Sequence, residues 1–255
     1  MLPNFIHIGA AKAASTWLWR ICQEHPDIYV PANSDCVQFF CTHYHRGLNW
    51  YEKTYFADWN GEKAVGETSN SYMLDERAIE RIAETLPGVK LTVCLRDPIE
   101  IAFLQYLTQK RSQRWTPEQW SFDNVLDNNR WQLFRMWIVP GLYHLHLTRI
   151  LKYVPRERVL IMLYDDLVAD ATTFAARFFS FLDVDANFTP PSLHKVIGFP
   201  SPKRPDTPEG DLQGGFSERL REELQRIFRE DVERLQGLIG RDLSHWLRWN
   251  PPQGP

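Results

Sequence analysis

Short apolar runs alternate with stretches of helical spacing along most of the chain. Continuous apolar runs predict buried strands at residues 4–9, 89–98 and 158–167, and a shorter strand is expected at the start of residues 61–73. Apolar positions at helical spacing predict helices at residues 15–24, 75–87, 99–111, 141–155, 172–184 and 217–240. This alternation is typical of an α/β fold, in which helices flank both faces of a central parallel sheet.

Two polar stretches interrupt the alternation. Residues 112–135 are polar and rich in tryptophan and predict an irregular helical insertion, whereas residues 198–215 are rich in proline and glycine and predict a loop. Nothing after this loop is large enough to fold alone. We therefore expect a single domain that spans residues 1–255.

Composition and charge exclude several classes of protein. Of the 255 residues, 44% are apolar and 24% are charged, and the net charge of −3 gives no basic field for nucleic acid. No apolar run approaches the roughly 20 residues that span a bilayer, and the N-terminus lacks the basic region of a signal peptide. The four cysteines show no C-x-x-C pair and no zinc spacing, so we expect the reduced thiols of a cytoplasmic protein.

The segment "GAAKAAST", residues 9–16, follows the first predicted strand and opens the first predicted helix. In open α/β sheets ligands bind beyond the carboxyl ends of the strands, and a helix start offers free N–H groups and positive potential. Small residues let the backbone approach an anion, Lys12 adds a charge, and Ser15 and Thr16 add hydroxyls. The segment predicts a phosphate or sulfate site. The alternative is an ordinary turn with a solvated lysine and an N-cap serine, because the nucleotide pattern G-x-x-x-x-G-K-[ST] is absent.

The motif "IGAAKAASTWL…HPDI" resembles the 5′-phosphosulfate loop of the sulfotransferases that use 3′-phosphoadenosine 5′-phosphosulfate (PAPS). The resemblance is closest to the heparan-sulfate-type branch and its bacterial relatives. Further segments follow in the family's order: "FFCTHYHRGLNWYEKTYF", "VGETSNSYM", "VKLTVCLRDPIEIAFLQYL", "GLYHLHLTRILKYVPRERVLIMLYDDLVAD" and "LREELQRIFREDVERLQGLIGRDLSHW". The resemblance covers most of the chain and implies a P-loop-like sulfotransferase fold.

The resemblance implies in-line transfer of a sulfuryl group from PAPS to a hydroxyl or amine, with adenosine 3′,5′-bisphosphate (PAP) as product and no metal. Lys12 would contact the 5′-phosphate and the bridging oxygen, and Arg96 would bind the 3′-phosphate. The 5′ end would be held by residues 13–17, which are Ala13, Ala14, Ser15, Thr16 and Trp17. The alternative for Arg96 is a surface salt bridge to Asp97 or Glu100. The acceptor would be a small molecule or a glycan, and a bacterial source with secondary metabolism is expected.

Lys203 and Arg204 lie where the family often places a basic loop over the 3′-phosphate, although a solvated proline-rich loop explains them equally well. The tryptophans at helical spacing are expected to pack in the core, with an aromatic acceptor pocket as the alternative. These are Trp115, Trp120, Trp131 and Trp137.

The chain departs from the family's pattern at four places. Ala14 replaces a loop glycine, which matters if that residue needs a positive φ. Leu104 replaces a serine ligand of the 3′-phosphate, and Thr68 stands where a lysine is expected. On the acceptor side, Cys36 replaces the glutamate that usually acts as general base, and Cys41 replaces an acidic residue.

Four residues are candidates to replace the missing base, because a thiol is mostly protonated at neutral pH. Asp35 lies next to the lost position, His43 and His45 follow the Phe-Phe pair, and Glu67 ends the middle strand. Each could also be an ordinary solvated or structural residue. The missing residues favour a second hypothesis, a weakened family member that binds ligand without efficient turnover. A P-loop phosphotransferase is disfavoured because no Gly-Lys-Ser/Thr is present.

Overall fold

The computed structural model describes residues 1–111, 122–126, 131–195 and 217–248. It divides into two compact units, Met1–Arg96 with His146–Phe199, and Asp97–Leu145 with Pro200–Pro255. Each unit is treated below by itself, and the single domain over residues 1–255 stays a prediction. Lys203, Arg204, Trp115 and Trp120 lie outside the described residues.

The first unit contains a five-stranded sheet in the order β2-β3-β1-β4-β5, and all of its strand pairs are parallel. The strands are β1 (Phe5–Gly9), β2 (Ile28–Tyr29), β3 (Ala64–Thr68), β4 (Lys90–Leu95) and β5 (Val159–Leu163). The α/β prediction is therefore confirmed. β2 was not predicted, because two residues flanked by prolines give no strand pattern. The predicted strand at 158–167 ends at Leu163, where a helix begins.

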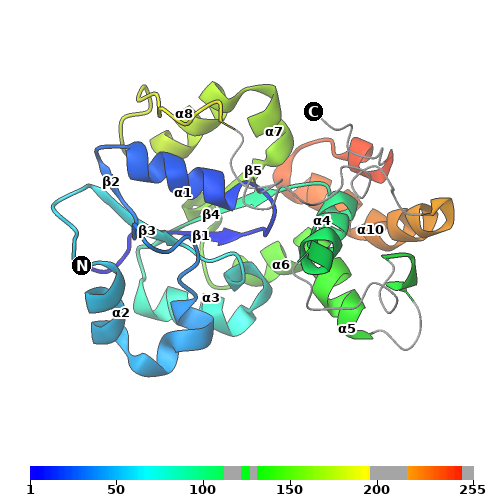
Figure 1. The fold of residues 1–255 in the computed structure, drawn as a ribbon, viewed down its shortest axis with the longest axis horizontal. Coiled ribbons are helices and arrows are strands. Elements are labelled where there is room, and N and C mark those ends of the chain that lie inside the picture. The colour runs from blue at the N-terminus through cyan, green and yellow to red at the C-terminus, as the bar shows by residue number, and fades with distance from the viewer. Residues whose placement is uncertain (112–121, 127–130, 196–216, 249–255) are drawn as a thin grey trace. The chain divides into compact units, whose positions relative to one another are not determined.

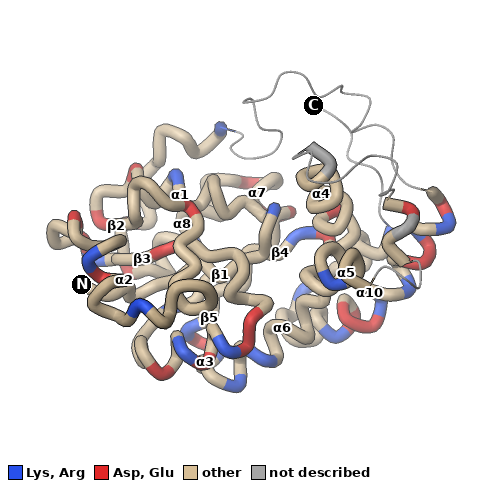
Figure 2. Tube along the Cα trace, turned by 60° about the horizontal axis from the view of Figure 1, so that its bottom comes forward, with Lys and Arg blue, Asp and Glu red and all other residues tan. Residues whose placement is uncertain are grey.

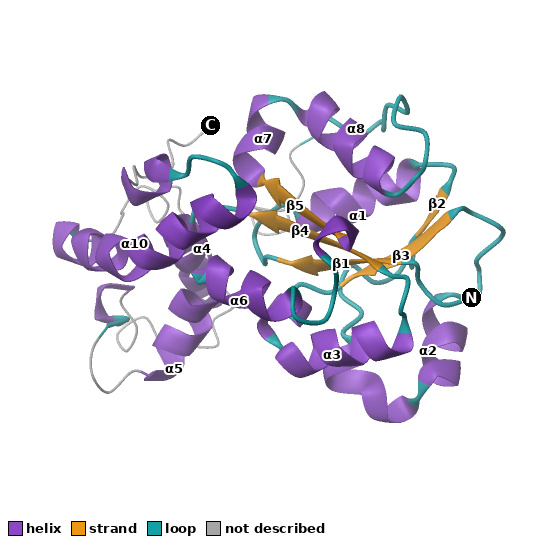
Figure 3. Ribbon diagram, turned by 180° about the vertical axis from the view of Figure 1, so that it is seen from behind, coloured by secondary structure: helices purple, strands orange, loops and turns teal. Residues whose placement is uncertain are grey.

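Helices cover both faces of this sheet, as predicted. Figures 1 and 3 show α1 and α8 on one face and α3 on the other. The helices of the unit are α1 (Ser15–Glu24), α2 (Leu48–Tyr55), α3 (Glu76–Thr85), α7 (Tyr164–Ala169) and α8 (Ala171–Phe181), and α6 (Tyr143–Ile150) enters it at His146. Phe5 meets Phe178 edge to face at 6.3 Å, which packs β1 against α8.

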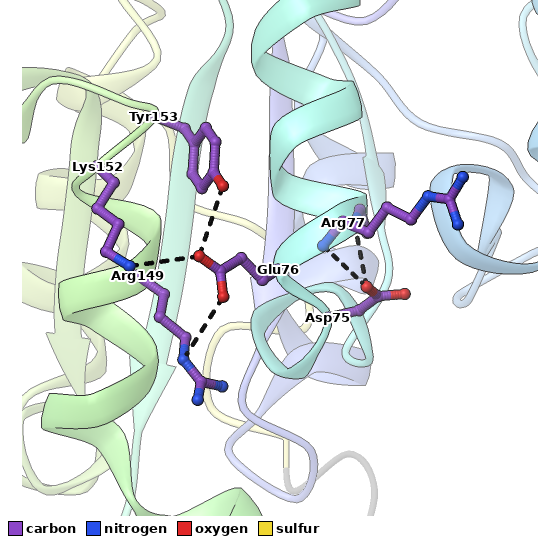
Figure 4. Close-up of polar contacts among 7 residues, drawn as sticks. Asp75, Glu76, Arg77, Arg149, Lys152 and Tyr153 are labelled. Carbon is purple, nitrogen blue, oxygen red and sulfur yellow. Dashed lines mark hydrogen bonds and ion pairs between the residues drawn. The ribbon is translucent and has the colours of Figure 1, made fainter.

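The start of α3 is fixed by two neighbouring acidic residues with different partners (Figure 4). Asp75 is the N-cap, and its Oδ1 accepts the N–H groups of Arg77 and Ala78 at 3.0 and 3.2 Å. Glu76 faces Arg149 and Lys152 at 3.7 and 3.4 Å. The cap supplies about 1 kcal/mol, whereas the exposed ion pairs add little.

The second unit contains α4 (Pro98–Arg111), α5 (Trp131–Leu133) and α10 (Glu218–Ile239), and Gly240 ends α10 in the left-handed conformation, as predicted. Acidic and basic positions alternate along α10 (Figure 2). Trp137 is buried and lies 5.4 Å from the Tyr106 ring, which confirms its predicted core role. Trp131 is 65% exposed and stacks on Phe134, so the prediction of a core residue was wrong there.

Candidate active site

The loop between β1 and α1 lies at the carboxyl edge of the central strand of the sheet. Lys12 and Ala14 both adopt left-handed backbone conformations, with φ of 65° and 69°. Ala14 is the N-cap and uses no side-chain cap, and the Leu18 N–H donates to its carbonyl at 2.9 Å. Residues in these conformations turn successive N–H groups toward one side, where an anion can bind. The N–H groups at the start of α1 point the same way along the helix axis.

Gly9 allows the loop to pass close to the end of β3. Its φ is 137°, and a Cβ at this position would lie 2.9 Å from the carbonyl oxygen of Asn70. A side chain at residue 9 would therefore meet backbone that cannot easily move. The glycine at the start of the loop is needed for both reasons.

Arg96 follows β4 and reaches the same loop. Its Nη1 donates to the Lys12 carbonyl at 3.1 Å, and its Cζ lies 4.0 Å from the centre of the Tyr164 ring. Sequence reasoning placed Arg96 near a ligand but gave no sign of Tyr164, because that residue lies in the helix that cuts short the predicted strand 158–167. These two contacts hold the guanidinium against the phosphate loop.

Ser15, Thr16 and Trp17 form the first turn of α1 and have different surroundings. The Ser15 hydroxyl is buried and lies 3.0 Å from Nδ2 of Asn70. Trp17 is buried, and its Nε1 donates to the Leu193 carbonyl at 3.3 Å. Only the backbone of Trp17 can therefore serve the predicted ligand.

The structure separates the two predicted catalytic candidates on the acceptor side. Asp35 is exposed, and its Oδ2 accepts a long hydrogen bond of 3.5 Å from the Thr16 hydroxyl, which places it at the phosphate loop. His43 ends a short helical segment, Phe39–His43, and its ring lies 5.6 Å from that of Trp50 in α2. His45 is exposed in the next turn.

The remaining candidate base, Glu67, is completely buried. Its carboxylate accepts hydrogen bonds from Tyr51, Ser69 and Tyr72 at 2.6, 2.7 and 3.1 Å. Burial raises the pKa of Glu67 to about 7. A carboxylate enclosed by three hydroxyls has no free approach for a substrate proton.

The thiol at the position of the family's glutamate is a poor base, as expected. Burial raises the pKa of Cys36, although donors from Gln38 and the Asn70 backbone partly oppose the shift. All four cysteines are free thiols. Thr68 and Leu104 are buried, at 3% and 4% exposure, so neither replaces the ligand that the family has there.

Asn70 is a residue that sequence reasoning missed. Its side-chain amide donates to the Ser15 hydroxyl of the phosphate loop, and its backbone lies near enough to the Cys36 thiol to lower the pKa of that thiol. It thereby connects the cofactor side of the site with the acceptor side. The only signal in the sequence was its position in a polar loop after a predicted strand.

The comparisons with known proteins agree with this geometry. A model of the sulfotransferase domain family matches residues 2–198. The chain belongs to the sulfotransferase domain family. Members of this family use PAPS as sulfuryl donor, and the predicted recognition and enzyme class are confirmed at this level.

Three relatives define its place in the family. Mouse bifunctional heparan sulfate N-deacetylase/N-sulfotransferase 4 is 29% identical over 199 residues, which cover 73% of this chain and 23% of that protein. Mouse heparan sulfate glucosamine 3-O-sulfotransferase 3B1 is 26% identical over 262 residues, covering 95% and 65%. The crystal structure of a sulfotransferase from Alicyclobacillus acidocaldarius has a TM-score of 0.80 at 28% identity and covers 96% of this chain and 99% of that one. The chain thus spans under a quarter of the first relative and about two thirds of the second.

The described residues contain no helix long and apolar enough to cross a membrane. They also contain no group of three or more His, Cys, Asp and Glu that could hold a metal ion. The acceptor, the bacterial source and the cytoplasmic location remain predictions.

Proposed function

We propose that this chain transfers a sulfuryl group from PAPS to a hydroxyl or amine of a small-molecule or glycan acceptor. The observation that carries the proposal is the loop at residues 9–16, with two left-handed residues, a lysine, two hydroxyls and an arginine against its backbone. All of these groups are cations or donors. They fit a nucleotide with phosphate at both ends of its ribose and a sulfuryl group at the 5′ end.

The residues of the site have distinct roles in the proposed reaction. Lys12 and the N–H groups of residues 13–17 neutralise charge as the bond between sulfur and the 5′-phosphate oxygen breaks. Arg96, held against the loop by its hydrogen bond to the Lys12 carbonyl, binds the 3′-phosphate. The new bond joins sulfur to the acceptor atom, whose proton goes to Asp35. We choose Asp35 over His43 because its carboxylate contacts Thr16 of the loop, whereas the ring of His43 packs against Trp50.

Binding and turnover should be tested separately. PAP, but not ADP, should raise the melting temperature without magnesium. Transfer of ³⁵S from PAPS is then measured on a panel of phenols, amino sugars and hydroxylated glycans. Lys12→Ala should abolish transfer, and Lys53→Ala, at an exposed position of α2, is the matched control.

The outcomes separate the hypotheses. Unchanged transfer by the Lys12→Ala variant would refute the assignment of the site. PAP binding with no transfer to any acceptor would favour the weakened, ligand-binding member of the family. Stabilisation by ADP and magnesium but not by PAP would favour a phosphotransferase.

A further inference from the structure

Glu67 has a second set of connections that the proposed reaction does not use. Its Oε1 accepts from the hydroxyls of Tyr51 and Tyr72, and its Oε2 accepts from the hydroxyl of Ser69. A buried charge is tolerated only where such donors replace water. The three hydroxyl donors differ in the other groups that they bind.

Two of these hydroxyls also bind the backbone of the acceptor-side segment, which we define as Cys36–Cys41. The Gln38 N–H donates to the Ser69 hydroxyl at 2.8 Å. The Phe40 N–H donates to the Tyr72 hydroxyl at 3.0 Å. A hydroxyl that accepts an N–H turns its own proton elsewhere, and here both protons go to Glu67. Each carboxylate oxygen of Glu67 is therefore joined through one hydroxyl to one backbone N–H of the segment: Oε2 through Ser69 to Gln38, and Oε1 through Tyr72 to Phe40. We call each of these two chains of hydrogen bonds a relay.

The acceptor-side segment needs this support because its backbone is strained. Gln38 has a φ of 56°, a left-handed conformation that costs a residue with a side chain about 1 kcal/mol. Further bonds hold the residues beside it: the Val37 N–H donates to the Thr68 carbonyl at 3.1 Å, and Arg81 donates to the Phe40 carbonyl at 2.6 Å. A conformation of this kind persists only where its surroundings fix it.

We propose that Glu67 is a positioning residue, whose carboxylate acts through Ser69 and Tyr72 to fix the acceptor-side segment in the shape that presents the acceptor. The consequence for the acceptor rests on the proposed function. The claim that Glu67 fixes the backbone of the acceptor-side segment does not rest on it, because that claim concerns only hydrogen bonds within the first unit. The same contacts explain why a carboxylate stays in a fully buried place, since an amide could not accept from both relays at once.

Tyr51 provides a matched control within the same cluster. Its hydroxyl makes the shortest of the three bonds to Glu67, at 2.6 Å, and its ring stacks on Phe39 at 4.1 Å. A phenylalanine at position 51 keeps the stacking and removes only a donor to Glu67. If Glu67 served stability alone, loss of the Tyr51 hydroxyl would be at least as harmful as loss of the Tyr72 hydroxyl.

Hydrogen exchange without any acceptor tests the relays directly. Tyr72→Phe should speed amide exchange at Phe40 by about 10-fold to 100-fold, and Ser69→Ala should do the same at Gln38, because each loses a buried partner. Ser69→Thr keeps the hydroxyl and should restore protection, and Tyr51→Phe should leave both amides as in the parent. Alkylation of Cys36 and Cys41 by iodoacetamide, mapped by mass spectrometry, should accelerate in the same variants, with buried Cys22 and Cys94 as internal references.

A pH profile separates positioning by the charge from a merely structural role. In the parent, protection of Gln38 and Phe40, corrected for intrinsic exchange, should be lost as pH falls through the ionisation of Glu67, whereas Glu67→Gln should show no such step. Tyr51 and Tyr72 contact Glu67, and the charge of Glu67 also acts on Tyr55 and Cys36. Burial raises the pKa of all four, so they stay neutral in this range.

The outcomes for the inference and for the proposed function differ. Equal exchange in the Tyr51→Phe and Tyr72→Phe variants, or no change in either, would overturn the positioning role. PAP affinity, measured by calorimetry, should stay within about twofold in all variants, because the phosphate loop is untouched. If the variants change hydrogen exchange as expected but the protein does not bind PAP, the proposed function is wrong and the positioning role of Glu67 is still supported.

Discussion

Replacing Glu67 by glutamine should change how stability depends on pH. Burial raises the pKa of this carboxyl from an ordinary value of 4.5 to about 7 in the folded protein. Between these values the folded protein binds more protons than the unfolded chain, so the free energy of unfolding falls as pH rises through this window. At about 1.36 kcal/mol for each pKa unit, the difference amounts to roughly 3 kcal/mol once the group is ionised in both states.

Glutamine removes this dependence because it carries no charge at any pH. Its altered hydrogen bonds add an offset that is the same at every pH. The free energy of unfolding of the variant minus that of the parent should therefore rise by about 2.5 kcal/mol between pH 5 and pH 8. The variant should become relatively more stable toward alkaline pH, where the parent holds a buried charge.

Guanidinium unfolding followed by tryptophan fluorescence at several pH values measures this difference. Glu80→Gln removes an exposed carboxylate from α3 and should follow the parent's curve. A constant difference between the Glu67→Gln variant and the parent from pH 5 to pH 8 would show that Glu67 titrates as an ordinary carboxyl. The account of its burial would then be wrong.

Four further substitutions test the loop and its neighbours. Ala14→Gly should raise the free energy of unfolding by about 1 kcal/mol in guanidinium titrations, because glycine adopts the φ of 69° without strain. Asp35→Asn should lower kcat for sulfuryl transfer by about 100-fold with little change in PAP affinity, whereas His43→Asn should leave kcat near the parent's value. Tyr164→Leu removes the ring that lies 4.0 Å from the Arg96 guanidinium and should weaken PAP binding about fivefold by calorimetry.

The parts of the fold with a regular period were predictable from the sequence. The helix at Ser15–Glu24 was predicted to begin at Ser15 and to end at about Glu24, because a small-residue turn and a proline mark its two ends. α2 was missed because glycine precedes it and few apolar residues repeat along it. The two-residue strand β2 depends on its pairing with Ala64 and Val65, which no local pattern encodes.

For the site, the sequence identified groups that follow strands but not their partners. Lys12 and Arg96 were predictable because both lie at carboxyl ends of buried strands. The contact between them joins residues 84 positions apart and follows only from the strand order. Glu67 looked like a possible base for the same reason. Its enclosure depends on Tyr51, a residue of a helix that was not predicted.

The strained residues of this site show how its shape is maintained. Lys12, Ala14 and Gln38 all adopt left-handed conformations that glycine would adopt without cost. Arg96 holds the carbonyl of Lys12, and Ser69 holds the N–H of Gln38, so neighbouring elements fix what local preference disfavours. Where the supporting group is buried and ionised, as Glu67 is, its charge fixes the backbone conformation but lowers the free energy of unfolding. Glu67→Gln should thus give a protein whose stability relative to the parent rises with pH and whose acceptor-side segment is looser, whereas Ala14→Gly relieves strain without removing any hydrogen bond.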